Sequence, residues 1–269
     1  MAARKSNPFL ILGGVLIAAF LALAVFGALF SPQDPNAMQA GEKLLAPSLT
    51  HLFGTDRFGR DIFSRALAGL GTTFFVAAAT VAIGAVFGTL TGALTGYYGG
   101  VADAALMRLN DTLTAFPAVL LALLAISLLG PGKESSLVLA LGLVFIPGYA
   151  RLMRTAFASL SNRAFVLSAR LMGAKGARII FVQLLPNTLP TLLPALTIGF
   201  NNAVLAEAGM SFLGIGVTPP DASLGYMLSE AQGMLAAAPW YAACVGGVIV
   251  LLVFAVGLFG EGLQRRMHT

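Results

Sequence analysis

The chain has 269 residues, of which 58% are hydrophobic and only 10% are charged, and its mean hydropathy is +0.87. This composition excludes an ordinary soluble domain and indicates a polytopic membrane protein built as one helical bundle. The net charge of +5 does not indicate nucleic-acid binding, because membrane proteins collect Lys and Arg on their cytoplasmic side.

Six apolar runs are long enough to cross a hydrocarbon core of about 30 Å as helices that rise about 1.5 Å per residue. The first run follows Arg4 and Lys5 and is longer than the apolar core of a signal peptide, so we expect a retained anchor. The predicted spans are residues 8–30, 72–96, 105–129, 136–156, 189–209 and 239–260. The sequence therefore predicts an all-α integral membrane protein with six transmembrane helices. We divide it into an anchor helix with an external segment, residues 1–71, and a core of five helices, residues 72–269.

The segment between the first two predicted spans is polar and irregular. Three prolines, Pro32, Pro35 and Pro47, disfavour regular structure there, and residues 61–70 could form an interfacial helix. Four charged residues in this segment could pair with one another or meet an external protein: Asp56, Arg57, Arg60 and Asp61. Because exposed ion pairs contribute only about 0–1 kcal/mol, we favour a structural role for the segment, as a lid.

The second predicted span carries a glycine at every fourth position, which places all of them on one helical stripe: Gly84, Gly88, Gly92 and Gly96. In lipid, helices associate through close packing rather than through the hydrophobic effect, so a stripe without side chains favours close approach. We predict a helix-packing seam, formed either with another helix of this chain or with a partner subunit. Prolines inside or at the starts of spans are compatible with kinked helices: Pro117, Pro147, Pro190 and Pro194.

Residues 163–187 form a basic stretch without any acidic residue, inside the longer loop 157–188. We expect a short helix over 163–172, ended by Gly173, since glycine readily adopts the left-handed conformation that closes a helix. A second helix is expected from Ala177 to Leu185, ending before Pro186. Two explanations remain open from the residues alone. One is a protrusion that docks into another protein through Phe165 and Met172, with the small residues Ser168 and Ala169 allowing close approach. The other is an amphipathic loop on anionic lipid.

Polar residues late in the fifth predicted span are Asn201, Asn202 and Glu207. An ionisable side chain inside a span is costly unless it faces a cavity, a partner or the interface. Glu207 could therefore line a translocation path, or it could lie at the external interface and hold the loop that follows.

The distribution of cations predicts the orientation of the bundle. With the N-terminus inside, 11 of the 16 Lys and Arg residues are cytoplasmic, including all four in 163–187. This agrees with the positive-inside rule, so we expect both termini and the loop 157–188 in the cytoplasm.

Several stretches resemble the permease subunits of binding-protein-dependent ABC importers. The family's signature loop reads E-A-A, three residues, G, nine residues, I-x-L-P. Its matching positions here are Leu167, Ser168, Ala169, Gly173, Gln183, Leu185 and Pro186. The glycine, the second alanine and Leu-Pro agree with that pattern, whereas the glutamate, the first alanine and the isoleucine do not. FGTDRFGRDIFSR (53–65), GYYGGVADAALMRLNDTLTAFP (96–117) and AEAGMSFLGIGVTPPDASLG (206–225) are similar to the dipeptide, oligopeptide and nickel branch, in its C-type subunit.

This resemblance implies a type I importer bundle in the bacterial cytoplasmic (inner) membrane. It implies that 157–188 couples the bundle to two cytoplasmic ATPase domains, and that a second, homologous permease and an external solute-binding protein complete the transporter. The expected role is half of the translocation pathway for peptides, with nickel or a metal chelate as the alternative cargo. ATP and magnesium are expected on the ATPase subunits, with no cofactor on this chain, because the sequence contains no G-x-x-x-x-G-K-[ST] phosphate loop.

Other function classes fit the residues less well. The single cysteine, Cys244, excludes an intramolecular disulfide and a Cys-based metal site. His51 and His268 lie outside the spans, where we expect them to be solvated or interfacial, and no pair of aspartates lies within a span, so an intramembrane protease is disfavoured. A self-contained channel or secondary transporter would be expected to carry more ionisable groups at depth. We therefore expect a transport subunit rather than an enzyme, in contact with membrane lipid and not with nucleic acid.

Overall fold

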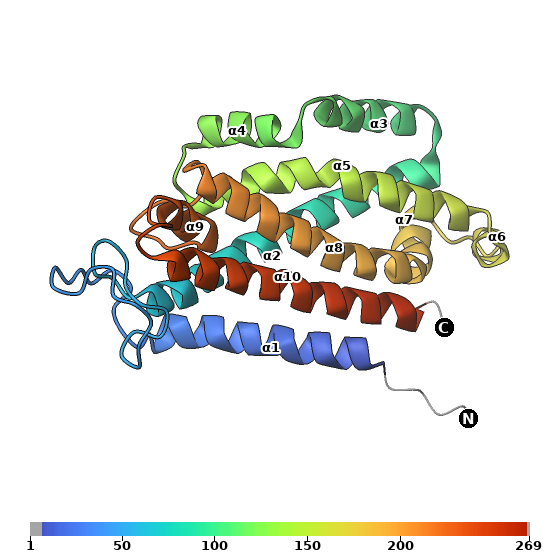
Figure 1. Ribbon diagram of the computed structural model, residues 1–269. Coiled ribbons are helices and arrows are strands. Elements are labelled where there is room, and N and C mark those ends of the chain that lie inside the picture. The colour runs from blue at the N-terminus through green and yellow to red at the C-terminus, as the bar shows by residue number, and fades with distance from the viewer. Residues whose placement is uncertain (1–6, 268–269) are drawn as a thin grey trace.

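The computed structural model describes residues 7–267, which form a bundle of long helices with shorter helices at both ends (Figure 1). Five helical segments of this part of the chain are long and apolar enough to cross a membrane: α1 (Pro8–Leu29), α2 (Ile62–Tyr98), α5 (Glu134–Ser161), Gly176–Phe212 and α10 (Pro239–Met267). A sixth crossing exists only if α3 (Gly100–Ala115) and α4 (Ala118–Leu129) together form one broken span. The predicted all-α membrane bundle is confirmed, with five or six spans.

The third predicted span, residues 105–129, is not one straight helix. α3 and α4 meet at an angle of 94°. The backbone of Phe116 is extended, with φ −87° and ψ 140°, and Pro117 begins the turn into α4. Proline disfavours the helical conformation of the residue before it, which explains the break at this position. The predicted span 105–129 is therefore broken at Pro117, one of the prolines expected to kink a span, and it crosses a membrane only if α3 and α4 are taken together.

α2 is longer than expected because the predicted interfacial helix 61–70 and the second predicted span form one continuous helix of 37 residues. Asp61 caps it, since its carboxylate accepts a hydrogen bond from the backbone N–H of Ser64 at 2.8 Å. The helix ends at Tyr98, and Gly99 follows with φ +62°. At about 1.5 Å per residue, α2 is roughly 55 Å long.

The glycine stripe of α2 lies against α5. A Cβ atom added at Gly88 would lie 2.8 Å from the carbonyl oxygen of Ile146, and one at Gly92 would lie 2.6 Å from that of Ala150. Gly84 and Gly96 make equally close approaches to α5, at Phe145 and Phe157. The stripe therefore packs within this chain, between two of its spans.

The region after α5 is helical almost without interruption. It contains α6 (Ala164–Leu171), α7 (Gly176–Arg178), a π-helical segment, η1 (Ile179–Leu184), and α8 (Leu185–Phe212). The helix expected to stop before Pro186 continues through it, because Pro186 lies in the first turn of α8, after the π-helical turns have changed the hydrogen-bond register. The fifth span is accordingly Gly176–Phe212 rather than 189–209.

The two ends of the bundle differ in what they carry. The start of α1 and the end of α10 lie at the same end as α6 and α7 (Figure 1). The segment between α1 and α2 lies at the opposite end, together with α9 (Leu224–Gln232). Arg4, Lys5 and His268 fall outside the described residues, so their predicted placement is not examined by the structure.

Candidate functional site

The helix α6 is seated on the bundle through one face. Val166 and Ala169 are 0% and 1% exposed and belong to a buried cluster with Phe157 of α5 and with Ile179 and Leu184 of η1. Residues three apart share a helical face, which is why these two turn inward together. Ala169 was expected on the surface that docks another protein, but it is a buried contact within this chain and cannot serve there.

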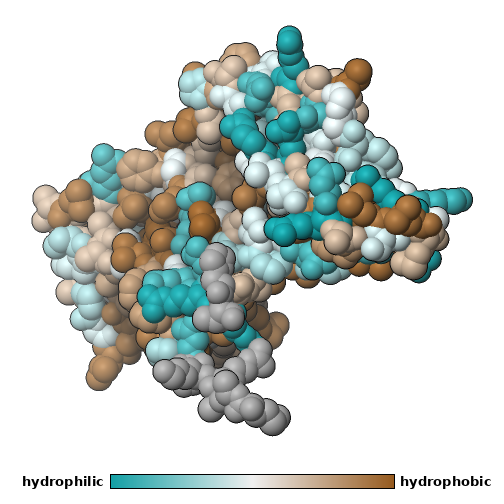
Figure 2. All heavy atoms as spheres, turned by 90° about the vertical axis from the view of Figure 1, so that its right-hand side faces the viewer, coloured by the Kyte–Doolittle hydropathy of each residue, from teal (hydrophilic) through white to brown (hydrophobic). Residues whose placement is uncertain are grey.

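The opposite face of α6 is apolar and open. Leu171 is 90% exposed and Met172 is 81% exposed, while Phe165 and Leu167 are 41% and 46% exposed. Ser168 is exposed between them. Figure 2 looks onto this end of the molecule, where hydrophobic patches are interleaved with hydrophilic residues. Leu171 was not among the predicted docking residues, although its four-residue spacing from Leu167 is a signal that could have identified it.

The turn after α6 depends on glycine. Gly173 has φ +82°, its N–H donates to the carbonyl of Arg170 at 2.9 Å, and the N–H of Ala174 donates to that of Ala169 at 3.0 Å. A Cβ at Gly173 would meet no atom within 4 Å, so the requirement for glycine comes from the backbone conformation and not from space. Beyond the turn, Leu185 is partly buried beside the cluster that seats α6, whereas Pro186 is exposed.

A groove of about 440 Å³ runs between α5 and α8. Asn202 lies on its α8 side and is exposed. Tyr149 lies on its α5 side, and the Tyr149 hydroxyl donates to the carbonyl of Ala195 at 3.3 Å. Gly148 leaves the groove wall bare of a side chain. The groove therefore combines apolar walls with the exposed amide of Asn202 and the exposed backbone at Gly148, groups that can contact a polar solute.

The polar residues of α8 do not converge on one site. Asn201 lies at a separate pocket of about 200 Å³ against α10, together with Thr197 and Gln264. Glu207 is 0% exposed and accepts hydrogen bonds from Thr73 at 2.8 Å and from Ser211 at 2.7 Å.

The hydroxyl of Ser211 also accepts from the backbone N–H of Val217 at 3.1 Å, and that of Thr73 from Leu224 at 3.3 Å. Through these two hydroxyls Glu207 holds the loop that follows α8 against α2. Of the two roles left open for Glu207, this arrangement favours the structural one.

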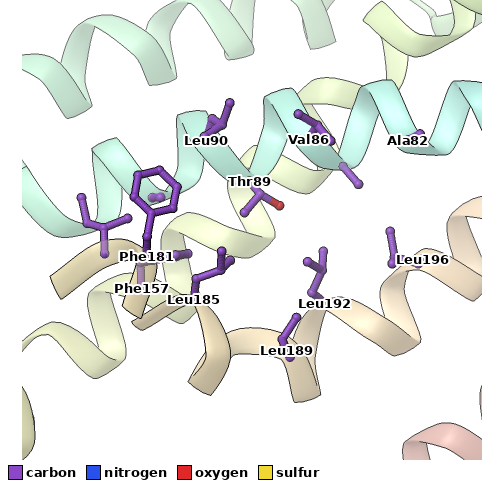
Figure 3. A pocket seen from close by; sticks show the side chains of 13 residues that line it. Ala82, Val86, Thr89, Leu90, Phe157, Phe181, Leu185, Leu189, Leu192 and Leu196 are labelled. Carbon is purple, nitrogen blue, oxygen red and sulfur yellow. The ribbon is translucent and has the colours of Figure 1, made fainter. Parts of the chain in front are cut away.

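A second groove of about 440 Å³ lies between α2 and the η1–α8 segment (Figure 3). Its labelled side chains are leucines, valine, alanine and phenylalanines, with Thr89 as the one polar member. The hydroxyl of Thr89 has no hydrogen-bond partner in the structure. Walls of this kind suit hydrocarbon rather than a polar solute, so this groove is a weaker candidate for a transport path.

At the end opposite α6, charged side chains form a buried network. Asp56 accepts from Arg60 Nε at 2.6 Å and from Arg65 Nη1 at 3.0 Å. Glu230 of α9 accepts from Arg60 Nη2 at 2.8 Å and forms an ion pair with Arg65, whose Nη1 lies 3.0 Å from Glu230 Oε2. The hydroxyl of Tyr241 in α10 donates to Glu230 at 3.2 Å. The network ties the external segment to α2, α9 and α10.

The expectation of exposed ion pairs in the external segment is wrong for Asp56 and Arg60, whose side chains are 0% and 6% exposed. Burial lowers the pKa of Arg60, but the hydrogen bond and charge of Glu230, and then those of Asp56, outweigh it and raise that pKa above its ordinary value. Arg60 therefore remains charged. Arg57 stays exposed outside this network and lies 4.7 Å from the centroid of the Phe58 ring.

His51 was expected to be solvated or interfacial, and the structure rules out the first of these. Its side chain is 6% exposed, and its Nδ1 lies 3.0 Å from Asp61 Oδ1 and 3.4 Å from Gln33 Nε2. Asp61 thus orients His51 in addition to capping α2. Both residues help to fold the external segment onto the bundle.

The chain is similar to known transport proteins over almost its whole length. Residues 84–269 match the family model of the binding-protein-dependent transport system inner membrane component. A dipeptide transport system permease protein of Haemophilus influenzae is 38% identical, over 97% of this chain and 90% of its own length. A second, from Alkalihalophilus pseudofirmus, is 36% identical over 97% and 85%. A di/tripeptide transport system permease protein of Pseudomonas aeruginosa is 37% identical over 94% and 86%.

The fold has a counterpart among solved structures. Inward-facing conformations of the MetNI methionine ABC transporter include a chain that superposes with a TM-score of 0.61 at 20% sequence identity. The match covers 76% of this chain and 96% of that one. This chain therefore shares its arrangement of helices with a chain of that transporter.

Proposed function

This chain belongs to the family of binding-protein-dependent transport system inner membrane components, and we propose that it carries short peptides as one permease subunit of an ATP-driven importer. The relatives of similar length, named for dipeptide or di/tripeptide transport, support peptides as the cargo. The observation that carries the mechanism is α6, which is anchored by Val166 and Ala169 and presents an open apolar face ending in Leu171 and Met172.

We infer from this geometry and from the missing phosphate loop that this chain forms part of the transport path and that separate subunits hydrolyse ATP. α6 is a short helix with an exposed apolar face, and such a face can bind in a groove of another protein. ATP and magnesium would bind to two cytoplasmic ATPase domains that dock there, and no cofactor would bind to this chain. The positive-inside bias supports the placement of this end of the bundle, and of both termini, in the cytoplasm.

The groove between α5 and α8 is our candidate for this chain's share of the translocation pathway. It is open on one side, so it forms a closed path only when a second, homologous permease covers it. Asn202, which is exposed in this groove, would offer hydrogen bonds to a peptide backbone as it passes. Selection among peptides would then belong mainly to the external solute-binding protein.

Gly173→Val tests the coupling role. Valine at φ +82° strains the turn by about 1–3 kcal/mol, enough to shift the turn toward another backbone conformation. We expect reconstituted complexes with this change to hydrolyse more ATP for each peptide imported, while the chain still inserts into the membrane. Gly173→Asn is the matched control, since asparagine tolerates the left-handed conformation better. Normal coupling in Gly173→Val complexes would contradict the role of this turn.

The identity of the transported solute is tested with the complete importer. Complexes with their cognate binding protein are expected to accumulate labelled di- and tripeptides in proteoliposomes when ATP is supplied inside. The same vesicles are offered a nickel chelate as the alternative cargo. Uptake of nickel without uptake of peptide would overturn the peptide assignment, and uptake of either cargo without ATP would favour a self-contained transporter.

A further inference from the structure

The end of α2 contacts the coupling region on both sides of its turn. Tyr97 and Tyr98 are the last residues of α2, and their ring centroids lie 4.9 Å apart at 82°. The guanidinium carbon of Arg170, in α6, lies 5.1 Å from the centroid of the Tyr97 ring. A Cβ at Gly176, the first residue of α7, would lie 2.6 Å from the Tyr98 hydroxyl and 3.3 Å from Tyr97 Cε1. α2 thus touches the element before Gly173 and the element after it.

The Tyr97 ring also closes the edge of the buried cluster under α6. Ala93, one turn earlier on α2, is 3% exposed and belongs to that cluster, and Tyr97 packs against it. Val166 anchors α6 in the same cluster. The ring therefore has apolar packing on one side and the Arg170 cation over its face, an arrangement that fixes its orientation.

α2 extends from this contact to the other end of the molecule as one helix of 37 residues. Near its start, Arg65 belongs to the buried network with Asp56 and Glu230. Along its length the glycine stripe holds it against α5. A displacement of the Tyr97 end would move α2 and α5 together, because closely packed helices have no room to slide independently.

We propose that Tyr97 is a positioning residue that fixes the angle between α6 and α2, so that movement of α6 is passed to α2 as well as to α5 and α8. This inference rests on the proposed coupling of α6 to an ATPase. Tyr97 touches neither ATP nor the transported solute; it acts by stacking on Arg170. The contact uses the ring and the cation, so phenylalanine can replace tyrosine at this position, whereas an aliphatic side chain cannot.

The experiment uses the complete importer, with both permeases, the ATPases and the binding protein, in proteoliposomes. The measured quantity is the number of ATP molecules hydrolysed for each peptide imported. Tyr97→Leu is expected to raise this ratio by about two- to fivefold, as loss of a cation–π contact would. Tyr97→Phe is expected to keep the wild-type ratio. Leu94→Ala is the matched control, because Leu94 lies on the exposed face of the same helix turn and is 46% exposed.

A double substitution identifies the contact itself. Arg170→Gln removes the cation from the other side and is expected to raise the ratio to the same extent as Tyr97→Leu. Combining the two is expected to add nothing, since both remove one interaction. Additive effects, or a wild-type ratio in Tyr97→Leu, would overturn the positioning role.

A cross-link separates this inference from the docking of α6 itself. Met172→Cys is introduced in a Cys244→Ser background, so that the new thiol is the one cysteine of the chain. A cross-link to the ATPase in both wild-type and Tyr97→Leu backgrounds, with a raised ratio in the latter, supports the proposal. A cross-link with unchanged ratios overturns the role of Tyr97 and leaves docking in place. Failure to cross-link in an active importer overturns the docking of α6, and the positioning role with it.

Discussion

Replacing Arg65 by methionine will destabilise the folded chain by about 3–5 kcal/mol, because it leaves two buried carboxylates, Asp56 and Glu230, to share the single remaining cation of Arg60. Arg65 is 1% exposed, and its Nη1 lies 3.0 Å from both Asp56 Oδ2 and Glu230 Oε2. Methionine fills much of the same volume as arginine, so the loss of stability would come from the missing charge rather than from a cavity. The measurement is denaturant unfolding of the purified chain in detergent, followed by the fluorescence of its single tryptophan, Trp240, which neighbours Tyr241 of the network.

Two variants give this prediction its controls. Arg57→Met removes an arginine of the same segment that is exposed and lies only over the Phe58 ring, so it is expected to cost less than about 1 kcal/mol. Arg65→Met combined with Glu230→Gln removes one buried positive charge and one buried negative charge together. This double variant is expected to recover part of the lost stability. Equal stability of the Arg57→Met and Arg65→Met chains would show that the network does not stabilise the external segment.

Gly92→Val will prevent α2 from closing on α5. A Cβ at this position would lie 2.6 Å from the carbonyl oxygen of Ala150 and 2.7 Å from the backbone nitrogen of Arg154. Both are backbone atoms of a helix, so they cannot rotate away as the end of a side chain could. Overpacking of this kind costs about 1–3 kcal/mol or more. We expect a sharp fall in the fraction of monodisperse protein that survives extraction from the membrane and mild heating, measured by size-exclusion chromatography.

The matched control is Gly247→Val in α10, where an added Cβ would meet no atom within 4 Å. This variant is expected to behave as the wild type does. Gly92→Ala is expected to fall between the two, since it adds the clashing Cβ without the branch. If Gly92→Val survives as well as Gly247→Val, then α2 and α5 do not pack as closely as the structure indicates.

Local features of the sequence sufficed for the bundle class and for the turn at Gly173. Hydropathy located every long span, and the four-residue spacing of the glycines placed them on one face of α2. Hydropathy predicted one crossing over 105–129, and Pro117, one of the prolines expected to kink a span, breaks it by 94°. Pro186 was expected to end a helix, but the helical segment continues through it because Pro186 lies in the first turn of α8.

Local features of the sequence could not predict which elements pack against each face of a helix. Glu230 lies 170 positions from Arg60, and nothing near either residue indicates that they meet. The burial of His51 and of Ala169 was missed because it depends on how separate elements fold against one another. The contact between Tyr97 and Arg170 is a further example, joining the last turn of α2 to the last turn of α6.

The sequence by itself therefore determined that this protein is a multi-spanning helical permease, with a glycine-closed turn at Gly173 and a bare stripe on its second span. Only the tertiary structure decided that the stripe meets α5, that the external charges are buried with Glu230, and that Leu171 rather than Ala169 faces outward. The physical reason is that helix formation and insertion into lipid depend on a residue and its neighbours within a few turns. Helix pairing in a membrane depends instead on shape and on buried polar partners, which residues far apart in the chain supply together.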